Sequence, residues 1–143
     1  MFAFCNEHKQ HLGLVSIDIP LISNLEVWLN IALIIQYHQN ISNSVARSYV
    51  LQYLERFNIK GIADKRNPAL THKERFYTML LRAVMVVDSI VVIDRPFQLL
   101  PYLPNADFII DALRIVADSH VESHVFEYSS NGYRYRTDNA EKN

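Results

Sequence analysis

The sequence predicts a single α/β domain with a helical insertion, and three observations support this fold class. The β-branched run Ser89–Asp94 is typical of a buried parallel strand. Helical periodicity dominates residues 24–87, ahead of that run, and a further helix and a short strand follow it. At 143 residues the chain is long enough for one domain with a real core and short for two.

The first elements are a short strand and a helix. Leu12–Ile17 predicts the strand, because an apolar run stops there at the turn-forming segment Asp18–Pro20. From Asn24 the apolar residues recur at three- and four-residue steps, which predicts a helix. Its apolar stripe consists of Leu25, Trp28, Leu29, Ala32 and Ile35, widened by Ile31 and Ile34.

Two more helices are expected in the middle of the chain. The polar break Asn40–Asn43 can cap one of them, and Lys60-Gly61 and Asn67-Pro68 bound the loop that follows. Thr71 and Glu74 have the spacing of a capping box, which predicts the start of the next helix. The residues expected on the inner faces are Ala46, Val50, Tyr53, Leu54 and Phe57 on the first helix, and Phe76, Met79, Leu80, Ala83, Val84 and Val87 on the second.

The remaining elements follow the β-branched run. Pro101 and Pro104 mark a loop, and Asn105 is the expected cap of a helix that runs to about Ser119. Ser123–Ser129 predicts another strand. The domain is expected to span residues 1–136, with 24–87 as the helical part and 88–136 as the remaining α/β core. The polar tail 137–143 is expected to be disordered.

Composition excludes several classes of protein. The formal charge is -1 and the 14 basic residues form no stripe, so no nucleic-acid partner is expected. Cys5 is the only cysteine, which rules out an internal disulfide and favours a reducing compartment. The first residues lack the pattern of a secretory signal, and charged or polar residues interrupt both apolar stretches before they reach membrane-spanning length. A cytoplasmic location is expected.

Several short motifs lie in the order and spacing seen in ABC-transporter ATPase domains, and the chain resembles that family over roughly residues 12–129. Segment 70–74 (LTHKE) stands at the signature, 82–84 (RAV) at the following Ala-Arg-Ala segment, and 90–96 (IVVIDRP) at Walker B. Upstream, 12–15 (LGLV) is similar to the strand before the Q-loop, 24–31 (NLEVWLNI) to the opening of the helical subdomain, and 53–59 (YLERFNI) to the helix end before the signature. The resemblance implies a partial P-loop-NTPase-like parallel sheet with a helical subdomain, lacking the Walker A strand and loop.

The departures from that family bear on catalysis. No G-x-x-x-x-G-K-[ST] phosphate-binding loop occurs among the three glycines, and only 11 residues precede Leu12, so we expect an N-terminally truncated domain. The Q-loop glutamine position is Ile17, and the signature glycine positions are His72 and Lys73, whose side chains take up the space of a phosphate. Arg95 replaces the general-base glutamate after Walker B.

Two further family positions have also changed. Pro101 replaces the D-loop aspartate, and no histidine stands at the H-loop position near Tyr128 or Ser129. Only Asp94 keeps its family identity among the polar groups of the nucleotide site, so no ATPase activity is expected and ATP with magnesium is not an expected cofactor.

Each vestigial residue also has a structural interpretation. Asp94 is a magnesium ligand or, as we favour, a strand-end carboxylate satisfied by backbone amides. Arg95 is expected to be solvated or paired with Asp94 or another acid. The capping box explains Thr71 and Glu74 fully, and Lys73 is expected to be solvated rather than part of an anion site at the helix N-terminus.

Other residues raise weaker possibilities. Cys5, His8 and His11 have the residue types of a zinc site, with a fourth ligand from His120, Glu122 or His124. No second paired motif supports it, so a polar N-terminal segment is favoured and no metal is expected.

Three aromatic residues are candidates for a partner surface. Trp28 lies on the wide apolar helix face that, by the resemblance, would meet a transporter's membrane subunit. Tyr133 and Tyr135 alternate with arginines as in an edge strand. Packing into the core and a last strand of the domain's own sheet are the favoured structural interpretations.

The sequence therefore favours a non-catalytic interaction or regulatory protein resembling an ABC transporter ATP-binding subunit. Self-association or a protein partner is expected, with a transporter subunit as one possibility and membrane association only through that partner. One alternative is a weak ATP-binding subunit that completes a composite site with an intact ATPase. A second alternative is an unrelated α/β binding module.

Overall fold

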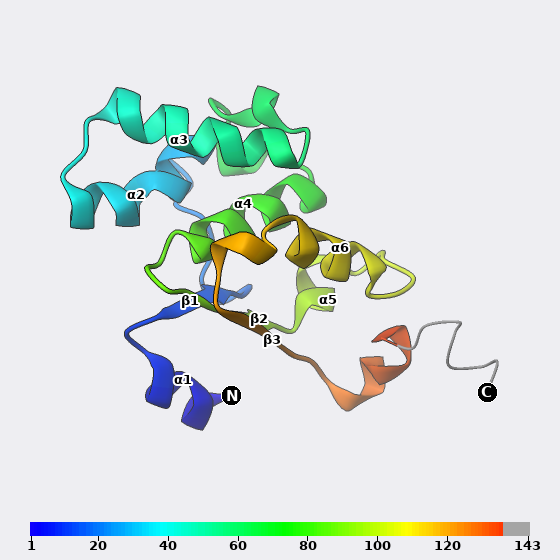
Figure 1. Cartoon of the computed structure of the whole chain (residues 1–143). Coiled ribbons are helices and arrows are strands. Elements are labelled where there is room, and N and C mark those ends of the chain that lie inside the picture. The colour runs from blue at the N-terminus through cyan, green and yellow to red at the C-terminus, as the bar shows by residue number, and fades with distance from the viewer. Residues whose placement is uncertain (136–143) are drawn as a thin grey trace.

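A three-stranded parallel sheet in the order β1-β2-β3 lies at the centre of the computed structural model, which describes residues 1–135 (Figure 1). The strands are β1 (Leu12–Val15), β2 (Ile90–Asp94) and β3 (Glu122–Phe126). Leu12 pairs with Ile90, and Ile90 pairs in turn with Glu122, so the three carboxyl ends meet at one edge of the sheet. Every residue of β2 is buried, as its β-branched sequence predicted.

Three longer helices form two layers above the sheet (Figure 1). Helix α4 (His72–Val84) packs directly on β1 and β2, and α2 (Val27–Gln39) packs on α4 and on α3 (Asn43–Arg56). Two 3₁₀ turns, η1 (Lys60–Ile62) and η2 (Asn67–Ala69), connect α3 to α4. This arrangement confirms the predicted α/β class with a helical insertion.

The remaining elements are short. They are α1 (Phe2–His8), α5 (Pro96–Leu99), α6 (Asp107–Ile115), η3 (Ala117–Ser119) and η4 (Ser129–Tyr135). In Figure 1, α1 lies on the side of the sheet opposite α4. None of the helices in residues 1–135 combines the length and apolarity needed to span a bilayer.

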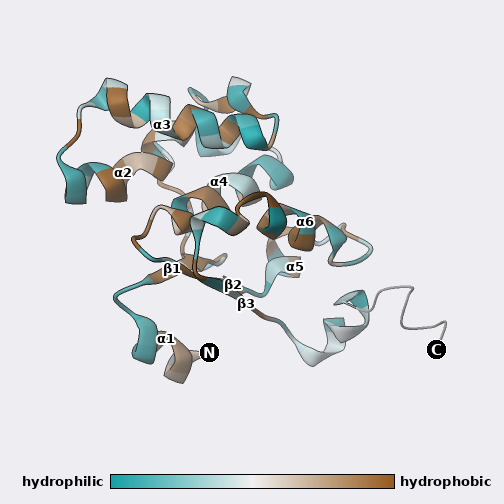
Figure 2. Cartoon of the chain, in the orientation of Figure 1, coloured by the Kyte–Doolittle hydropathy of each residue, from teal (hydrophilic) through white to brown (hydrophobic). Residues whose placement is uncertain are grey.

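The core lies between α4 and its neighbours. Phe76, Met79 and Leu80 of α4 are buried against Ile31 of α2 and Ile93 of β2. In Figure 2 the ribbon is hydrophobic in β1 and in the second half of α4, and pale or polar over η4. Val87, expected on the inner face of this helix, is exposed because α4 ends at Val84.

The predicted helix caps are present at α3 and α4. The Ser42 hydroxyl accepts a hydrogen bond from the Val45 amide, and both halves of the capping box formed by Thr71 and Glu74 are made. Helix α2 begins at Val27 rather than Asn24. Its Asn30, which looked like a polar break in the sequence, is buried because its side chain bonds backbone groups of the preceding loop, at Ile22 among others.

The N-terminal segment, for which the sequence predicted no element, is a helix whose Phe4 packs against His124 and Phe126 of the sheet. Two predictions in the second half of the chain are wrong. The helix expected to run from Asn105 to Ser119 is shorter: it begins at Asp107, and the Asn105 side chain accepts from the Asp107 amide in a turn that precedes it.

The second wrong prediction is the last strand. Tyr133 and Tyr135 lie in η4 rather than in the sheet. The Arg134 carbonyl accepts from the Ala106 amide, and the Arg134 guanidinium lies over the Phe97 ring, so this segment packs on α5 and the start of α6. The boundary predicted at residue 136 and the predicted tail 137–143 lie outside the described residues.

Candidate functional site at the strand ends

Asp94 closes β2 and is only 4% exposed. One carboxylate oxygen, Oδ2, accepts hydrogen bonds from Ser16 Oγ at 3.0 Å and from Arg95 Nη2 at 3.0 Å. The other oxygen, Oδ1, accepts from Arg95 Nε at 3.1 Å. Side chains, and not the backbone amides expected from the sequence, therefore satisfy this carboxylate, and both of its oxygens are occupied.

Arg95 joins the ends of all three strands. Its Nη2 lies 2.6 Å from Asp18 Oδ2, just after β1, and its Nη1 donates to Tyr128 Oη at 3.4 Å, just after β3. The hydrogen bonds to Asp94 first, and then to Tyr128, hold the pKa of Arg95 above its ordinary value. The expectation that Arg95 pairs with Asp94 or a neighbouring acid is confirmed.

The backbone at Arg95 directs its side chain back over the strand end. Arg95 has φ 47° and ψ 59°, in the left-handed region, and its amide donates to the Phe126 carbonyl at 2.6 Å. Pro96 then starts α5, where the Glu127 carboxylate accepts from the Phe97 amide at 3.1 Å. Two hydrogen bonds thus hold the turn after β2: one is accepted by the Phe126 carbonyl at the end of β3, and the other by the Glu127 side chain just after β3.

The residues at the Q-loop position, Ile17, and at the signature positions, His72 and Lys73, lie beside this cluster rather than within it. Ile17 is 47% exposed and lines a small pocket together with His72. The His72 ring also faces Tyr102, at 5.9 Å between ring centroids, while Lys73 Nζ lies 4.9 Å from the centre of the Phe108 ring. The side chains at both signature positions, His72 and Lys73, therefore lie close to aromatic rings, those of Tyr102 and Phe108.

The cluster also contains Ser16 and Asp18, which sequence reasoning missed, and Tyr128, which it considered only as the place of the missing H-loop histidine. Each follows a predicted strand or closes it, and carboxyl ends of parallel strands meet at one edge of a sheet. For Ser16 and Asp18 that rule is the only signal that was available. The distances that join them to Asp94 and Arg95 depend on the tertiary fold.

The other candidate residues lie away from the strand ends. Trp28 is half-buried against the core, and Tyr135 is half-buried with its ring 5.5 Å from that of Phe97, whereas Tyr133 is exposed. At the N-terminus, His11 Nδ1 bonds the Val87 carbonyl and Cys5 is a free thiol. Within residues 1–135, no group of three histidine, cysteine or acidic side chains is placed to hold a metal ion.

Comparison with solved structures places this arrangement in a known fold. The chain is similar to MJ0796, described as a bacterial ABC transporter cassette and solved as a dimer, with a TM-score of 0.65 and 17% sequence identity. The similarity covers 90% of this chain and 57% of that chain, so the present sequence spans little more than half the length of the cassette. No protein-family model matches the chain, and no curated protein does.

The similarity confirms the resemblance inferred from the motifs at the level of the fold. The chain shares with the ABC cassette a parallel sheet covered by helices, and the β2 strand preceded by α4 is present as predicted. The fold is therefore that of part of an ABC cassette, and not an α/β arrangement of another kind.

Proposed function

We propose that this protein is a non-catalytic interaction subunit built on part of the fold of an ABC ATP-binding cassette. The observation that carries the proposal is the pairing of Asp94 with Arg95, because it occupies the one nucleotide-site carboxylate that the family resemblance retains. A magnesium ion at Asp94 would have to displace a guanidinium that is also held by Asp18.

The position of Arg95 also removes the proton acceptor. By the resemblance, this residue stands where a glutamate activates the attacking water, and a guanidinium cannot accept a proton at any ordinary pH. The amino-acid sequence has no G-x-x-x-x-G-K-[ST] motif to cradle phosphates. This sequence therefore has neither the usual loop that binds the phosphates nor the usual base that activates the attacking water.

The α4 N-terminus argues in the same direction. Glycines at the signature allow a backbone to approach a phosphate closely, whereas His72 and Lys73 here carry side chains that lie over Tyr102 and Phe108. The first turn of α4 is already satisfied by the capping box between Thr71 and Glu74. These residues have a complete structural role without nucleotide.

The free edge of β3 is the interaction surface that we propose. Among the described residues, β3 pairs only with β2, so its other edge offers unpaired backbone groups. Val125 within β3 is 37% exposed, and Val121, just before the strand, is 67% exposed. An extended segment from another chain can add to such an edge and cover these side chains.

Two partners are compatible with this surface. A second copy of the chain can pair its β3 edge with the same edge across a twofold axis. A transporter subunit is the partner class that the family resemblance implies, and it would bring this protein to the membrane from the cytoplasm. We propose self-association first, because it requires no other gene product.

Thermal melting with and without magnesium-ATP tests the non-catalytic role. A ligand that binds the folded state raises the melting temperature, so we expect no shift. A clear rise would contradict the proposal and favour the alternative of a weak ATP-binding subunit, with Asp94 released from Arg95 to act as a ligand. Arg95→Ala tests that route, since it frees Asp94 without adding a phosphate-binding loop.

Light scattering tests the β3 edge. We expect a mass above the 16.6 kDa of one chain, and we expect Val125→Lys to return the protein to that mass, because a charged residue on an edge strand opposes pairing. Val45→Lys, at an exposed position of α3, is the matched control and should leave the mass unchanged. A monomeric wild-type protein, or equal effects of the two variants, would contradict self-association through β3.

A further inference from the structure

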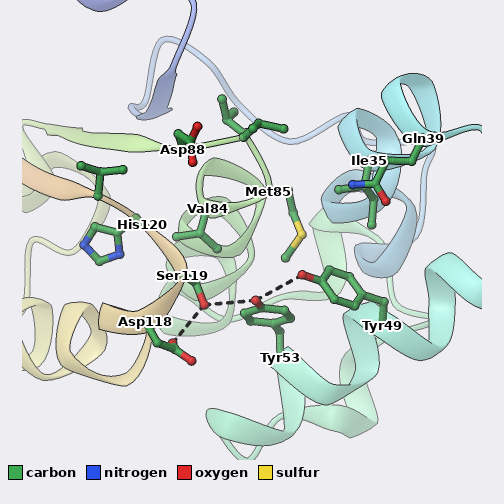
Figure 3. Close-up of a pocket in the computed structure, with 13 residues that line it drawn as sticks. Ile35, Gln39, Tyr49, Tyr53, Val84, Met85, Asp88, Asp118, Ser119 and His120 are labelled. Carbon is green, nitrogen blue, oxygen red and sulfur yellow. Dashed lines mark hydrogen bonds between the residues drawn. The ribbon is translucent and has the colours of Figure 1, made fainter.

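A polar cavity of about 410 Å³ lies between the helical layers and the turn that leads into β3 (Figure 3). Four segments line it: α2, α3, the end of α4 with the turn after it, and residues 118–121. Its volume lies within the range of sites that hold small molecules, ~300–1,000 Å³. It is separate from the strand-end cluster, with which it shares no lining residue.

The charged residues that line the cavity are two acids. Asp88 and Asp118 are among its lining residues, which include no lysine or arginine. Asp118 is paired with Arg56 at 2.7 Å, just outside the lining. Asp88, in contrast, is a solvent-exposed residue at the rim of the cavity, held at φ 50° in the left-handed region, and its carboxylate makes no hydrogen bond or ion pair within residues 1–135.

The end of α4 adds to the negative potential. Val84 is the last residue of α4, and residues 84–88 form one wall of the cavity. The final carbonyls of a helix carry the negative end of its dipole, which favours a cation. The His120 ring is turned toward its own segment, since Nδ1 bonds the Val116 carbonyl at 2.8 Å.

Two tyrosines from α3 form the opposite wall, and Figure 3 shows their hydroxyls in a chain that leads to Ser119 and Asp118. The Tyr49 and Tyr53 rings are 5.3 Å apart in an edge-to-face pair. The Arg56 guanidinium already lies 4.5 Å from the centre of the Tyr53 ring. Arg56 does not line the cavity, so it occupies the Tyr53 ring from outside, and the Tyr49 ring is the aromatic surface that remains for a cation in the cavity.

We propose that this cavity is a binding site for a small organic cation that carries an ammonium group. The ammonium lies between the Asp88 carboxylate and the tyrosine wall, and the hydroxyl of Ser119 and the amide of Gln39 receive the polar part of the ligand. The site is independent of the proposed non-catalytic role, because it uses none of the residues at the strand ends.

Choline and its neutral isostere 3,3-dimethyl-1-butanol test the requirement for positive charge. Both have the same shape, so calorimetric titration of the whole protein isolates the charge. We expect choline to bind and the neutral alcohol to bind much more weakly. Equal binding of the two, binding of neither, or binding of inorganic phosphate in this cavity would overturn the proposal.

Asp88→Asn tests the position of the ammonium. Asparagine adopts the left-handed conformation of this residue readily, so the variant should keep the fold. Loss of the carboxylate should weaken choline binding by about fivefold, as expected for one partly solvated charge contact. Asp111→Asn removes an exposed acid that does not line the cavity and should leave the affinity unchanged.

The tyrosine wall is tested separately. Tyr49→Phe keeps the ring and should bind choline nearly as the wild type does, whereas Tyr49→Leu removes the aromatic face and should bind several times more weakly. Unchanged affinity in both Asp88→Asn and Tyr49→Leu would overturn the site. An equal loss in Asp88→Asn and Asp111→Asn would show a general charge effect and would also overturn it.

Discussion

Arg95 reaches back over the residue that precedes it because its backbone is left-handed at φ 47°. A non-glycine residue in that region costs roughly 1 kcal/mol, so contacts elsewhere must hold it there. Those contacts are the hydrogen bond from the Arg95 amide to the Phe126 carbonyl and the ion pairs with Asp94 and Asp18. A position that the sequence marks only as a lost general base is therefore the centre of the strand-end cluster.

We predict that Asp94→Asn destabilises the protein by about 2 kcal/mol, since a buried carboxylate that accepts charged hydrogen bonds contributes about that much. Urea unfolding of the purified protein measures the change. Asp64→Asn is the control, because Asp64 pairs with Arg47 on an exposed surface and such pairs contribute little. Equal stability of Asp94→Asn and the wild type would show that the strand-end cluster does not support the fold.

Sequence reasoning at the residue scale identified Asp94 and Arg95 but not their partners. Both could be found because they close a buried strand and occupy family positions. Ser16 and Asp18 contact them from 78 and 77 positions away, and no local pattern encodes such a distance. The fold brings them together, so only the fold identifies them.

At the scale of elements, agreement with the sequence depends on local signals. Helix α4 was predicted well because Thr71 and Glu74 cap it and its apolar residues follow one face. The strand β2 was predicted because β-branched residues fill it. The segments α1 and η4 were missed because tertiary contacts, made by Phe4 and Arg134 with residues far along the chain, accompany their conformation and leave no local signal.

Thr71→Ala is predicted to lower the stability by about 1 kcal/mol, because it removes the hydroxyl that accepts from the Glu74 amide. Thermal or urea unfolding measures the loss. Ser48→Ala changes an exposed residue in the middle of α3 and should have little effect or a slightly favourable one. A similar loss in both variants would contradict the role of the cap.

Gly13 marks the place where β1 and α4 lie closest. A Cβ at this position would lie 2.3 Å from the Ala83 carbonyl oxygen, which belongs to the α4 backbone and cannot move aside cheaply. We predict that Gly13→Ala destabilises the protein by about 3 kcal/mol or more.

The control for this prediction is Gly61→Ala. A Cβ at Gly61 meets nothing within 4 Å, so this variant should unfold at nearly the same urea concentration as the wild type. Equal unfolding midpoints for the two alanine variants would contradict the close approach of β1 and α4.

The whole molecule is held together by contacts between its helical and sheet layers. Arg56 of α3 pairs with Asp118 in the turn before β3, and Tyr53 of the same helix bonds Ser119. The hydrogen bond from Arg56 first, and then that from Ser119, keep the pKa of Asp118 below its ordinary value of 3.8. These contacts fix the walls of the cavity between the layers.

Three tyrosines, Tyr49, Tyr77 and Tyr135, have a raised pKa and make the stability of the whole protein sensitive to alkali, and burial is the main cause at Tyr77. Burial, with Glu127 as a smaller cause, raises the pKa of Tyr135 from 10.0 to about 12, and the hydrogen bond to Tyr53 with burial does the same for Tyr49. The unfolded chain therefore loses these protons at lower pH than the folded protein does. We predict that the stability these tyrosines contribute is fully present below pH 10 and is lost between pH 10 and 12, so the free energy of unfolding falls over that range.

Urea unfolding at a series of pH values measures this dependence, and the absorbance of ionised tyrosine follows the titration directly. Tyr135→Phe should remove one late-titrating group and flatten the decline above pH 10. Tyr37→Phe changes an exposed tyrosine and should leave the decline as it is. An unaltered curve in Tyr135→Phe would contradict the assignment.

The parallel sheet also sets the order in which the chain can fold. Its first two strands are joined by contacts such as that between Ser16 and Asp94, 78 positions apart, so their pairing closes a long loop. Helices α2 to α4 form from nearby residues and can precede that step. Within residues 1–135, β1 pairs with β2 alone, so during synthesis its apolar Leu12–Val15 segment must wait for β2 before that pairing forms, and chaperones can bind it in the interval.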